Sequence, residues 1–108
     1  MSVVHSDLAG GRWHSMTLAE QLGNIGSEYE RAHRFREQGD DSRFRSASDR
    51  FLELLDLTLA DPRWRGRRLR ELARVRETAC EELFSPERTE KTLHRYFFSF
   101  ALSARRER

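Results

Sequence analysis

An apolar side chain recurs every three or four residues between Thr17 and Gly39, and this spacing is the strongest constraint on the fold. A period close to 3.6 residues places these side chains on one face of an amphipathic helix, as a seam close to the heptad kind. Thr17 and Glu20 form a capping-box pattern that predicts the start of the helix, and Gly39 predicts its end. The members of the repeat are Leu18, Leu22, Ile25, Tyr29 and Ala32.

Three more amphipathic segments follow. A second helix is predicted from about residue 42 to 60, with Asp61-Pro62 ending it. Its broad apolar face comprises Phe44, Ala47, Phe51, Leu55 and Leu59, widened by Leu52, Leu54 and Leu57. A third helix is predicted from about Arg67, and Arg76 falls within its apolar stripe. That stripe comprises Leu69, Leu72, Ala73, Ala79, Cys80 and Leu83.

The last helix is predicted to begin at Ser85-Pro86, with Thr89 as the alternative N-cap. It carries Leu93, Tyr96, Phe97, Phe100, Ala101 and Ala104. Only six Gly and two Pro occur in 108 residues, so turns are few and elements are long. We predict an all-α, up-down-up-down antiparallel four-helix bundle over residues 13–108, preceded by a loose, flexible N-terminal arm, residues 1–12.

The composition indicates a cytoplasmic protein that does not enter a membrane. The single cysteine, Cys80, excludes an intramolecular disulfide and is usual in a reducing compartment. The N-terminus lacks the basic and apolar regions of a signal peptide. No apolar run approaches the ~20 residues that span a bilayer.

No residue constellation predicts catalysis, a metal or a cofactor. Glu30 and His33 form one Glu-x-x-His pair, but di-iron bundles need a second copy, so both residues are expected on a solvated helix flank. Cys80 lies on an apolar stripe and is expected to act as a small buried hydrophobe. Because no glycine-rich phosphate loop follows a strand either, we do not predict an enzyme.

Two glycines inside the first predicted helix need a separate explanation. Each costs about 0.5–1 kcal/mol relative to alanine, which the close approach of another backbone would offset. That backbone belongs either to the same bundle or to another subunit. Arg76 similarly needs a carboxylate partner or an interface. Candidate residues of an oligomer or partner interface are therefore Trp13, Gly23, Gly26 and Arg76, and we expect a homo-oligomer.

The segment PRWRGRRLRELARVR, residues 62–76, is the most basic part of the chain. It contains seven Arg and one Glu, whereas residues 77–90 contain five acids and one Arg, so the surface is polarised. Several guanidinium groups beside a flat aromatic ring suit RNA or single-stranded DNA. The candidate nucleic-acid-binding residues are Arg63, Trp64, Arg65, Arg67, Arg68, Arg70 and Arg74. Alternatively, Arg67 and Arg74 pair with Glu71 and Glu77, and Trp64 packs into the bundle end.

Three stretches carry a resemblance to known proteins. WHSMTLAEQLGNIGSE (13–28), LELLDLTLADPRWRGRRLRELARVRE (52–77) and YFFSFALSAR (96–105) resemble short uncharacterised bacterial helical proteins. More distantly, the length, basic helical character and four-helix pattern resemble the accessory variability determinant proteins of diversity-generating retroelements. That resemblance implies a ring-like oligomer that binds a reverse transcriptase and contacts nucleic acid through basic surfaces.

The sequence therefore yields two hypotheses. The first is a non-catalytic accessory subunit that binds RNA or single-stranded DNA through phosphate contacts beside a reverse transcriptase of a diversity-generating retroelement. The alternative is a protein–protein interaction or oligomerisation module without nucleic-acid binding, in which the basic and acidic stretches pair between chains. An enzyme remains an option only if Glu30 and His33 face an internal metal.

Overall fold

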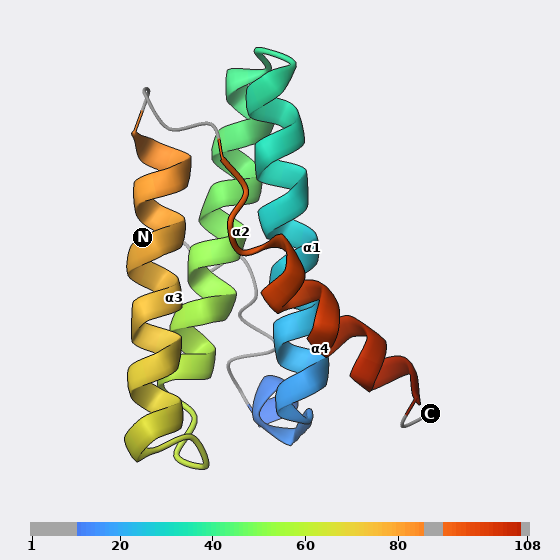
Figure 1. Cartoon of the computed structure of the whole chain (residues 1–108), viewed down its shortest axis with the longest axis vertical. Coiled ribbons are helices and arrows are strands. Elements are labelled where there is room, and N and C mark those ends of the chain that lie inside the picture. The colour runs from blue at the N-terminus through green and yellow to red at the C-terminus, as the bar shows by residue number, and fades with distance from the viewer. Residues whose placement is uncertain (1–10, 86–89, 107–108) are drawn as a thin grey trace.

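The described part of the chain consists of helices joined by short loops. The computed structural model describes residues 11–85 and 90–106 (Figure 1). A short 3₁₀ turn, η2 (Trp13–Ser15), precedes four helices, which are α1 (Leu18–Glu37), α2 (Asp41–Leu59), α3 (Gly66–Phe84) and α4 (His94–Arg106). These two ranges contain no strand, so the predicted all-α class and the four helices are confirmed.

The start of α1 and the turn between α1 and α2 both have the structures that their sequence signals predict. At the start of α1, the Thr17 hydroxyl accepts a hydrogen bond from the Glu20 N–H (3.1 Å), and the Glu20 carboxylate accepts one from the Thr17 N–H (2.9 Å). The predicted capping box is therefore confirmed. At the far end Gly39 has a φ of 70°, a left-handed conformation that favours glycine. Asp40 then caps α2 by accepting a hydrogen bond from the Arg43 N–H.

The fourth helix is arranged differently from the other three. Figure 1 shows α1, α2 and α3 side by side, whereas α4 runs obliquely across α1. The crossing requires small residues, because a Cβ added at Gly26 would lie 2.5 Å from Phe97 Cβ. A Cβ at Gly23 would lie 3.3 Å from Ala101 Cα. α3 packs mainly on α2, and an open groove lies between α3 and the residues that lead into α4.

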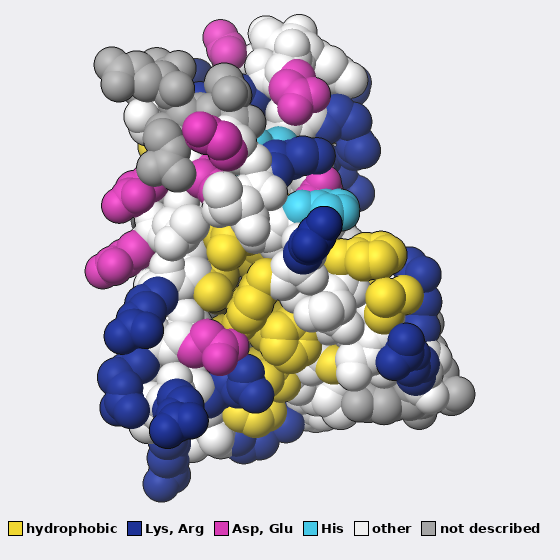
Figure 2. Space-filling model, in the orientation of Figure 1, with side chains coloured by type: hydrophobic (Ala, Val, Ile, Leu, Met, Phe, Trp, Pro, Cys, Tyr) yellow, Lys and Arg dark blue, Asp and Glu magenta, His cyan; other side chains and the backbone are white. Residues whose placement is uncertain are grey.

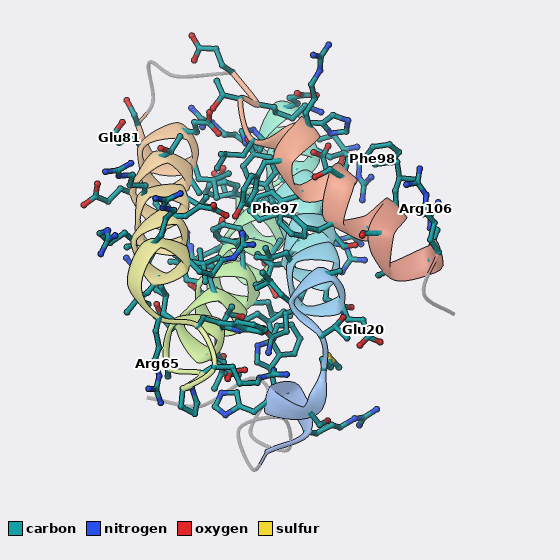
Figure 3. All side chains as sticks on the ribbon, turned by 60° about the horizontal axis from the view of Figure 1, so that its bottom comes forward. Glu20, Arg65, Glu81, Phe97, Phe98 and Arg106 are labelled. Atoms are coloured by element: carbon teal, nitrogen blue, oxygen red, sulfur yellow. The ribbon has the colours of Figure 1, made fainter. Side chains whose placement is uncertain are left out.

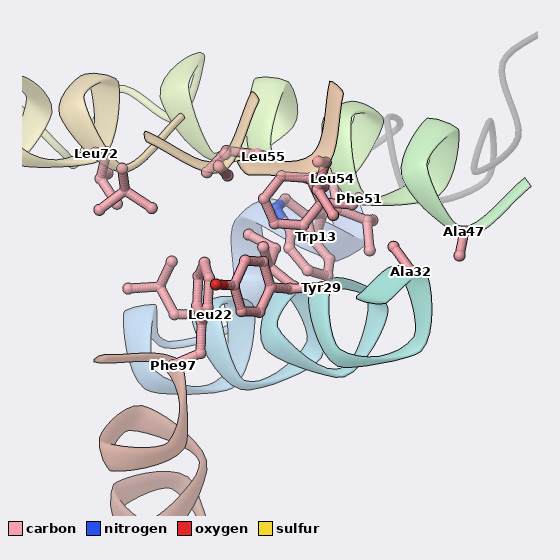
Figure 4. Close-up of a cluster of buried hydrophobic side chains, with 14 residues drawn as sticks. Trp13, Leu22, Tyr29, Ala32, Ala47, Phe51, Leu54, Leu55, Leu72 and Phe97 are labelled. Carbon is pink, nitrogen blue, oxygen red and sulfur yellow. The ribbon is translucent and has the colours of Figure 1, made fainter. Parts of the chain in front are cut away.

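One apolar cluster joins the helices (Figure 4). The α1 stripe supplies four of its members, Leu22, Ile25, Tyr29 and Ala32, all fully buried as predicted. The other large side chains are Trp13 of η2, Phe51 and Leu55 of α2, Leu72 of α3 and Phe97 of α4. The Tyr29 ring centroid lies 5.2 Å from that of Phe97 and 6.0 Å from that of Phe51. Tyr29 therefore links α1 with α2 and α4.

The buried face of α3 is rotated from the predicted one. Leu69 is 37% exposed and Ala73 is also exposed, so their assignment to the apolar face is wrong. The buried residues of α3 are Leu72, Val75, Ala79, Glu82 and Leu83. A hydrogen bond from the Tyr29 hydroxyl (2.5 Å) holds the Glu82 carboxylate inside. A charged residue thus occupies a core position of α3. It lies on the same face of the helix as Leu72 and Val75.

The start of α4 also differs from the prediction. Ser85, the predicted N-cap, instead terminates α3, and α4 begins at His94. Pro86 and Thr89, the other residues of that prediction, lie outside the described residues. The backbone ahead of α4 is bonded to buried side chains, since Glu82 accepts from the Thr92 N–H (2.9 Å) and hydroxyl. These long-range bonds set where α4 begins, which local capping signals could not show.

Candidate nucleic-acid interface

The loop between α2 and α3 is built on a buried carboxylate. Asp61 is 2% exposed, and its carboxylate accepts hydrogen bonds from the Arg63 backbone N–H (3.0 Å) and from Arg63 Nη2 (2.7 Å). The side-chain hydrogen bond from Arg63 holds the pKa of the Asp61 carboxyl well below its usual range. The same Nη2 donates to the Met16 carbonyl (2.7 Å). Arg63 thus ties the loop to the start of α1.

Trp64 belongs to the same network. Its Nε1 donates to Gln21 Oε1 (2.9 Å), and the Arg63 guanidinium lies 4.6 Å from the centroid of its ring. Gln21 Nε2 donates to the Trp13 carbonyl (2.8 Å) and to Asp61 Oδ2 (3.1 Å). We call these five residues, Trp13, Gln21, Asp61, Arg63 and Trp64, the Asp61 network. The tryptophan predicted to stack on nucleic acid therefore makes intramolecular contacts on its ring and its N–H.

The arginines of α3 have a different environment. Arg67, Arg70 and Arg74, which we call the α3 arginine row, are all exposed and line an open groove of about 570 Å³. Within the described ranges 11–85 and 90–106, no hydrogen bond or ion pair involves these three side chains. The alternative pairs Arg67–Glu71 and Arg74–Glu77 are absent from those ranges as well. The row is therefore a set of hydrated positive charges on one helix face.

The two remaining arginines predicted at this site lie beside the row. Arg68 forms an ion pair with Glu71 (2.8 Å), and Arg65 Nε donates to the Pro62 carbonyl (2.8 Å). Arg65 is also the N-cap residue of α3, and its side chain makes no capping hydrogen bond. The first N–H groups of a helix carry partial positive charge and suit an anion. The uncapped end of α3 thus adds to the positive potential of the row.

The groove lies between α3 and the residues that lead into α4. Its lining consists of the α3 arginine row with Glu71, Val75, Thr78 and Leu93. Figure 2 shows an apolar strip along this gap, with Lys and Arg side chains over the first half of α3 and Asp and Glu over its second half. In Figure 3, Arg65 and Glu81 accordingly mark opposite ends of α3. The part of the predicted polarity that falls on α3 is thus visible, whereas residues 86–89 of the acidic stretch lie outside the described residues.

Arg76 finds a carboxylate within the chain. Its Nε donates to Asp56 Oδ1 of α2 (2.8 Å), and this hydrogen bond raises the pKa of Arg76. The Arg76 side chain is 38% exposed, and it lies at the edge of the rotated α3 face rather than inside an apolar stripe. The carboxylate partner that the sequence predicts for Arg76 is therefore found within the chain, on α2.

The other predicted interface residues also make contacts inside the chain. Trp13 is 1% exposed, and its Nε1 donates to the Thr58 hydroxyl (2.9 Å). Gly23 and Gly26 face α4, with Phe97 against Gly26. Of the two explanations given for the glycines, the described contacts match close approach within the bundle. Figure 3 shows Phe97 turned toward the interior and its neighbour Phe98 turned away from it.

The Glu-x-x-His pair does not lie on a solvated flank as predicted. His33 is 2% exposed, and its Nε2 lies 3.9 Å from Glu82 Oε1 without a hydrogen-bond partner among the described residues. Burial lowers its pKa. Glu30 bonds instead to His94 (2.7 Å) and Lys91 (3.2 Å). Across the described ranges, no three His, Cys, Asp or Glu side chains are grouped so as to hold a metal ion.

Several residues of the groove escaped the sequence analysis. Thr78 has no distinctive sequence signal, and Leu93 was assigned only to an apolar stripe. Glu71 was considered only as a partner of Arg67. Its actual partners are Arg68, three residues before it, and the Tyr96 hydroxyl of α4 (2.6 Å). The i,i+3 spacing of Arg68 and Glu71 was a signal for the first pair.

Comparison with known proteins adds no relative: no family model, curated protein or solved structure matches this chain significantly. Within the described ranges, no helix has both the length and the apolar character to cross a membrane.

Proposed function

We propose that this chain is a non-catalytic accessory subunit that binds the phosphate backbone of RNA or single-stranded DNA. The observation that supports the proposal best is the α3 arginine row, three exposed guanidinium groups with no partner in the described chain, along one groove. Guanidinium groups bind phosphate oxygens in bidentate geometry, and the released counterions drive association. Unpaired arginines keep this capacity because they lose no internal ion pair on binding.

The spacing of the row suits one strand. Arg67 and Arg74 are separated by seven residues, about 10 Å along the helix axis. A nucleic-acid backbone carries one negative charge per nucleotide, so arginines spread over this length can contact more than one phosphate of the same strand.

The proposal extends to assembly and location. Association with the reverse transcriptase of a diversity-generating retroelement, within a homo-oligomer, rests on the resemblance in length, basic character and four-helix pattern. The up-down-up-down order is part of that pattern, and the short connection between α1 and α2 supports it. The single Cys80, a free thiol, supports a cytoplasmic location.

A second candidate function is protein–protein interaction without nucleic acid. Two phenylalanines favour it, since Phe84 and Phe98 are 49% and 47% exposed. In that case the basic and acidic halves of α3 pair between copies. Sedimentation at two salt concentrations then shows an oligomer that dissociates at high salt, and nucleic acid does not bind.

The decisive experiment is binding of a structured RNA and of single-stranded DNA across a salt series. The triple variant R67A/R70A/R74A is compared with R34A/R43A/R45A, which removes the same charge from exposed arginines around the α1–α2 turn. Each lost phosphate contact lowers the slope of log K against log salt by about 0.7–0.9. We expect the α3 triple to lose about two units of slope and the control triple to lose none.

Two results would overturn the proposal. One is the absence of binding by the wild-type protein at low salt. The other is an equal loss of slope in both triples, which would mean that net charge alone attracts the nucleic acid. Circular dichroism of both triples shows whether the helices are intact, so that unfolding is not mistaken for lost contacts.

A further inference from the structure

The groove beside the α3 arginine row has a floor whose chemistry differs from its rim. The three arginines are exposed, whereas Val75 is 6% exposed and Leu93 is half-buried. The apolar strip in Figure 2 runs between α3 and α4. A phosphate chain requires only the rim. An apolar floor next to a cationic rim instead suits a ligand that is charged on one side and flat and apolar on the other.

Glu71 makes the floor unsuitable for phosphate. It lies in the groove between the arginines, and its negative charge repels an anion there. Both of its hydrogen bonds, from Arg68 and from the Tyr96 hydroxyl, end on Oε2. Oε1 accepts no hydrogen bond from any described residue. This oxygen is therefore held in the groove as an acceptor that no described side chain or backbone group occupies.

We infer that this groove binds unpaired nucleobases. In this arrangement the phosphates lie on the α3 arginine row. The base faces lie against Val75 and Leu93. An exocyclic amino group of the base donates a hydrogen bond to Glu71 Oε1. The inference rests on the proposed function, since it names what the same site selects. Bases paired in a duplex are stacked inside the helix and cannot reach a groove floor, so the site prefers single strands.

The amino-group contact implies a preference among bases. Cytosine carries an N4 amino donor, whereas thymine carries an O4 acceptor at the equivalent position. A carboxylate oxygen therefore attracts the first and repels the second. Trp64 does not provide an alternative stacking surface in this structure, because Arg63 lies against its ring and its Nε1 is bonded to Gln21.

The test varies the ligand first, because that requires no change in the protein. Fluorescence anisotropy compares dC, dT and abasic oligodeoxynucleotides of equal length, together with a hairpin duplex, at one salt concentration. The abasic chain has the same phosphates but no bases. We expect it and the duplex to bind about five- to tenfold more weakly than the dC chain, with dT between them. Equal affinity of the dC and abasic chains overturns the inference.

Variants then locate the contact. Glu71→Gln replaces the carboxylate by an amide that can donate as well as accept, so the dC and dT affinities should converge. Leu93→Ala should lower dC binding several-fold and leave abasic binding unchanged. Phe98→Ala is the matched control, because Phe98 is an exposed apolar residue of α4 that does not line this groove. Loss of base selectivity in F98A overturns the assignment to the groove.

The two proposals fail in different ways. If all four ligands bind equally and the α3 triple still loses slope, phosphate binding stands and the base site is wrong. If no ligand binds at low salt, the proposed function is wrong and the base site falls with it.

Discussion

Arg63 and Arg67 are four residues apart in one basic segment, yet they have different roles in the molecule. Arg63 makes hydrogen bonds to the buried Asp61 and to a carbonyl at the start of α1. Arg67, with Arg70 and Arg74, has no such partner among the described residues and lines an open groove. The basic segment therefore has two structurally different parts. Arg63 anchors the loop, whereas Arg67, Arg70 and Arg74 are exposed charges on one helix face.

The difference arises from where carboxylates lie. Asp61 follows the end of α2 with its side chain buried, so a charged partner is needed close by and Arg63 supplies it. Glu71 is the only acid within residues 62–76, and it is bonded to Arg68 and Tyr96. Among the described residues, no carboxylate forms an ion pair or a hydrogen bond with the α3 arginine row. An excess of arginine over acidic residues in a sequence segment therefore predicts unpaired guanidinium groups only for arginines that do not lie near a buried carboxylate.

The largest expected effect is on the loop anchor. Asp61→Asn keeps the size of the side chain but places an amide donor where Oδ2 accepts from Gln21 Nε2 and Arg63 Nη2. Gln21 cannot turn over to compensate, because its amide oxygen accepts from Trp64 and its amide nitrogen donates to the Trp13 carbonyl. We expect a loss of about 2–4 kcal/mol in the free energy of unfolding, measured with urea.

The same variant tests the separation of roles. When it is kept folded at low temperature, D61N should retain the salt dependence of nucleic-acid binding. A loss of salt slope in D61N without loss of helix content would show that the two arginine groups act as one surface, and the comparison would fail.

Acidification should act on the same anchor. The folded-state pKa of Asp61 is depressed from its ordinary value of 3.8, so the carboxylate contributes stability above that pH, and the contribution is lost as pH falls below it. The amide that replaces this carboxyl group in D61N does not titrate. We expect the stability difference between wild type and D61N to be constant above about pH 5 and to shrink below about pH 4. Urea unfolding of both proteins at each pH measures it, and a constant gap at pH 3 contradicts the role of Asp61.

Much of the fold was predictable from local patterns. The α1 stripe, its capping box and the Gly39 turn each depend on residues close in sequence, and each is found in the structure. The face of α3 and the start of α4 were not predictable in this way. Both depend on Glu82, whose partners Tyr29 and Thr92 are 53 and 10 residues away. Nothing in the sequence near Glu82 marks it as a buried acid.

The candidate site was predictable in part for the same reason. The shared face of Arg67, Arg70 and Arg74 follows from helical spacing alone. The separation of Arg63 from this row depends on the burial of Asp61, which only the packed loop shows. The groove floor depends on the position of Leu93 beside α3, since α4 crosses α1 instead of lying along α3.

The smallest expected effect comes from a matched pair of single variants, Arg63→Ala and Arg74→Ala. R63A removes the bonds to Asp61 and to Met16, but the exposed position of Arg63 lets water reach the carboxylate. We therefore expect a loss of about 1–2 kcal/mol, smaller than in D61N. R74A removes no hydrogen bond or ion pair with a described residue, and its stability should change by less than about 0.5 kcal/mol. In nucleic-acid binding the order reverses: R74A loses about 0.7–0.9 of salt slope and R63A loses none.

Chemical unfolding and a salt titration of both variants give the four values, and a loss of both stability and salt slope in either variant would mean that one arginine serves fold and ligand together.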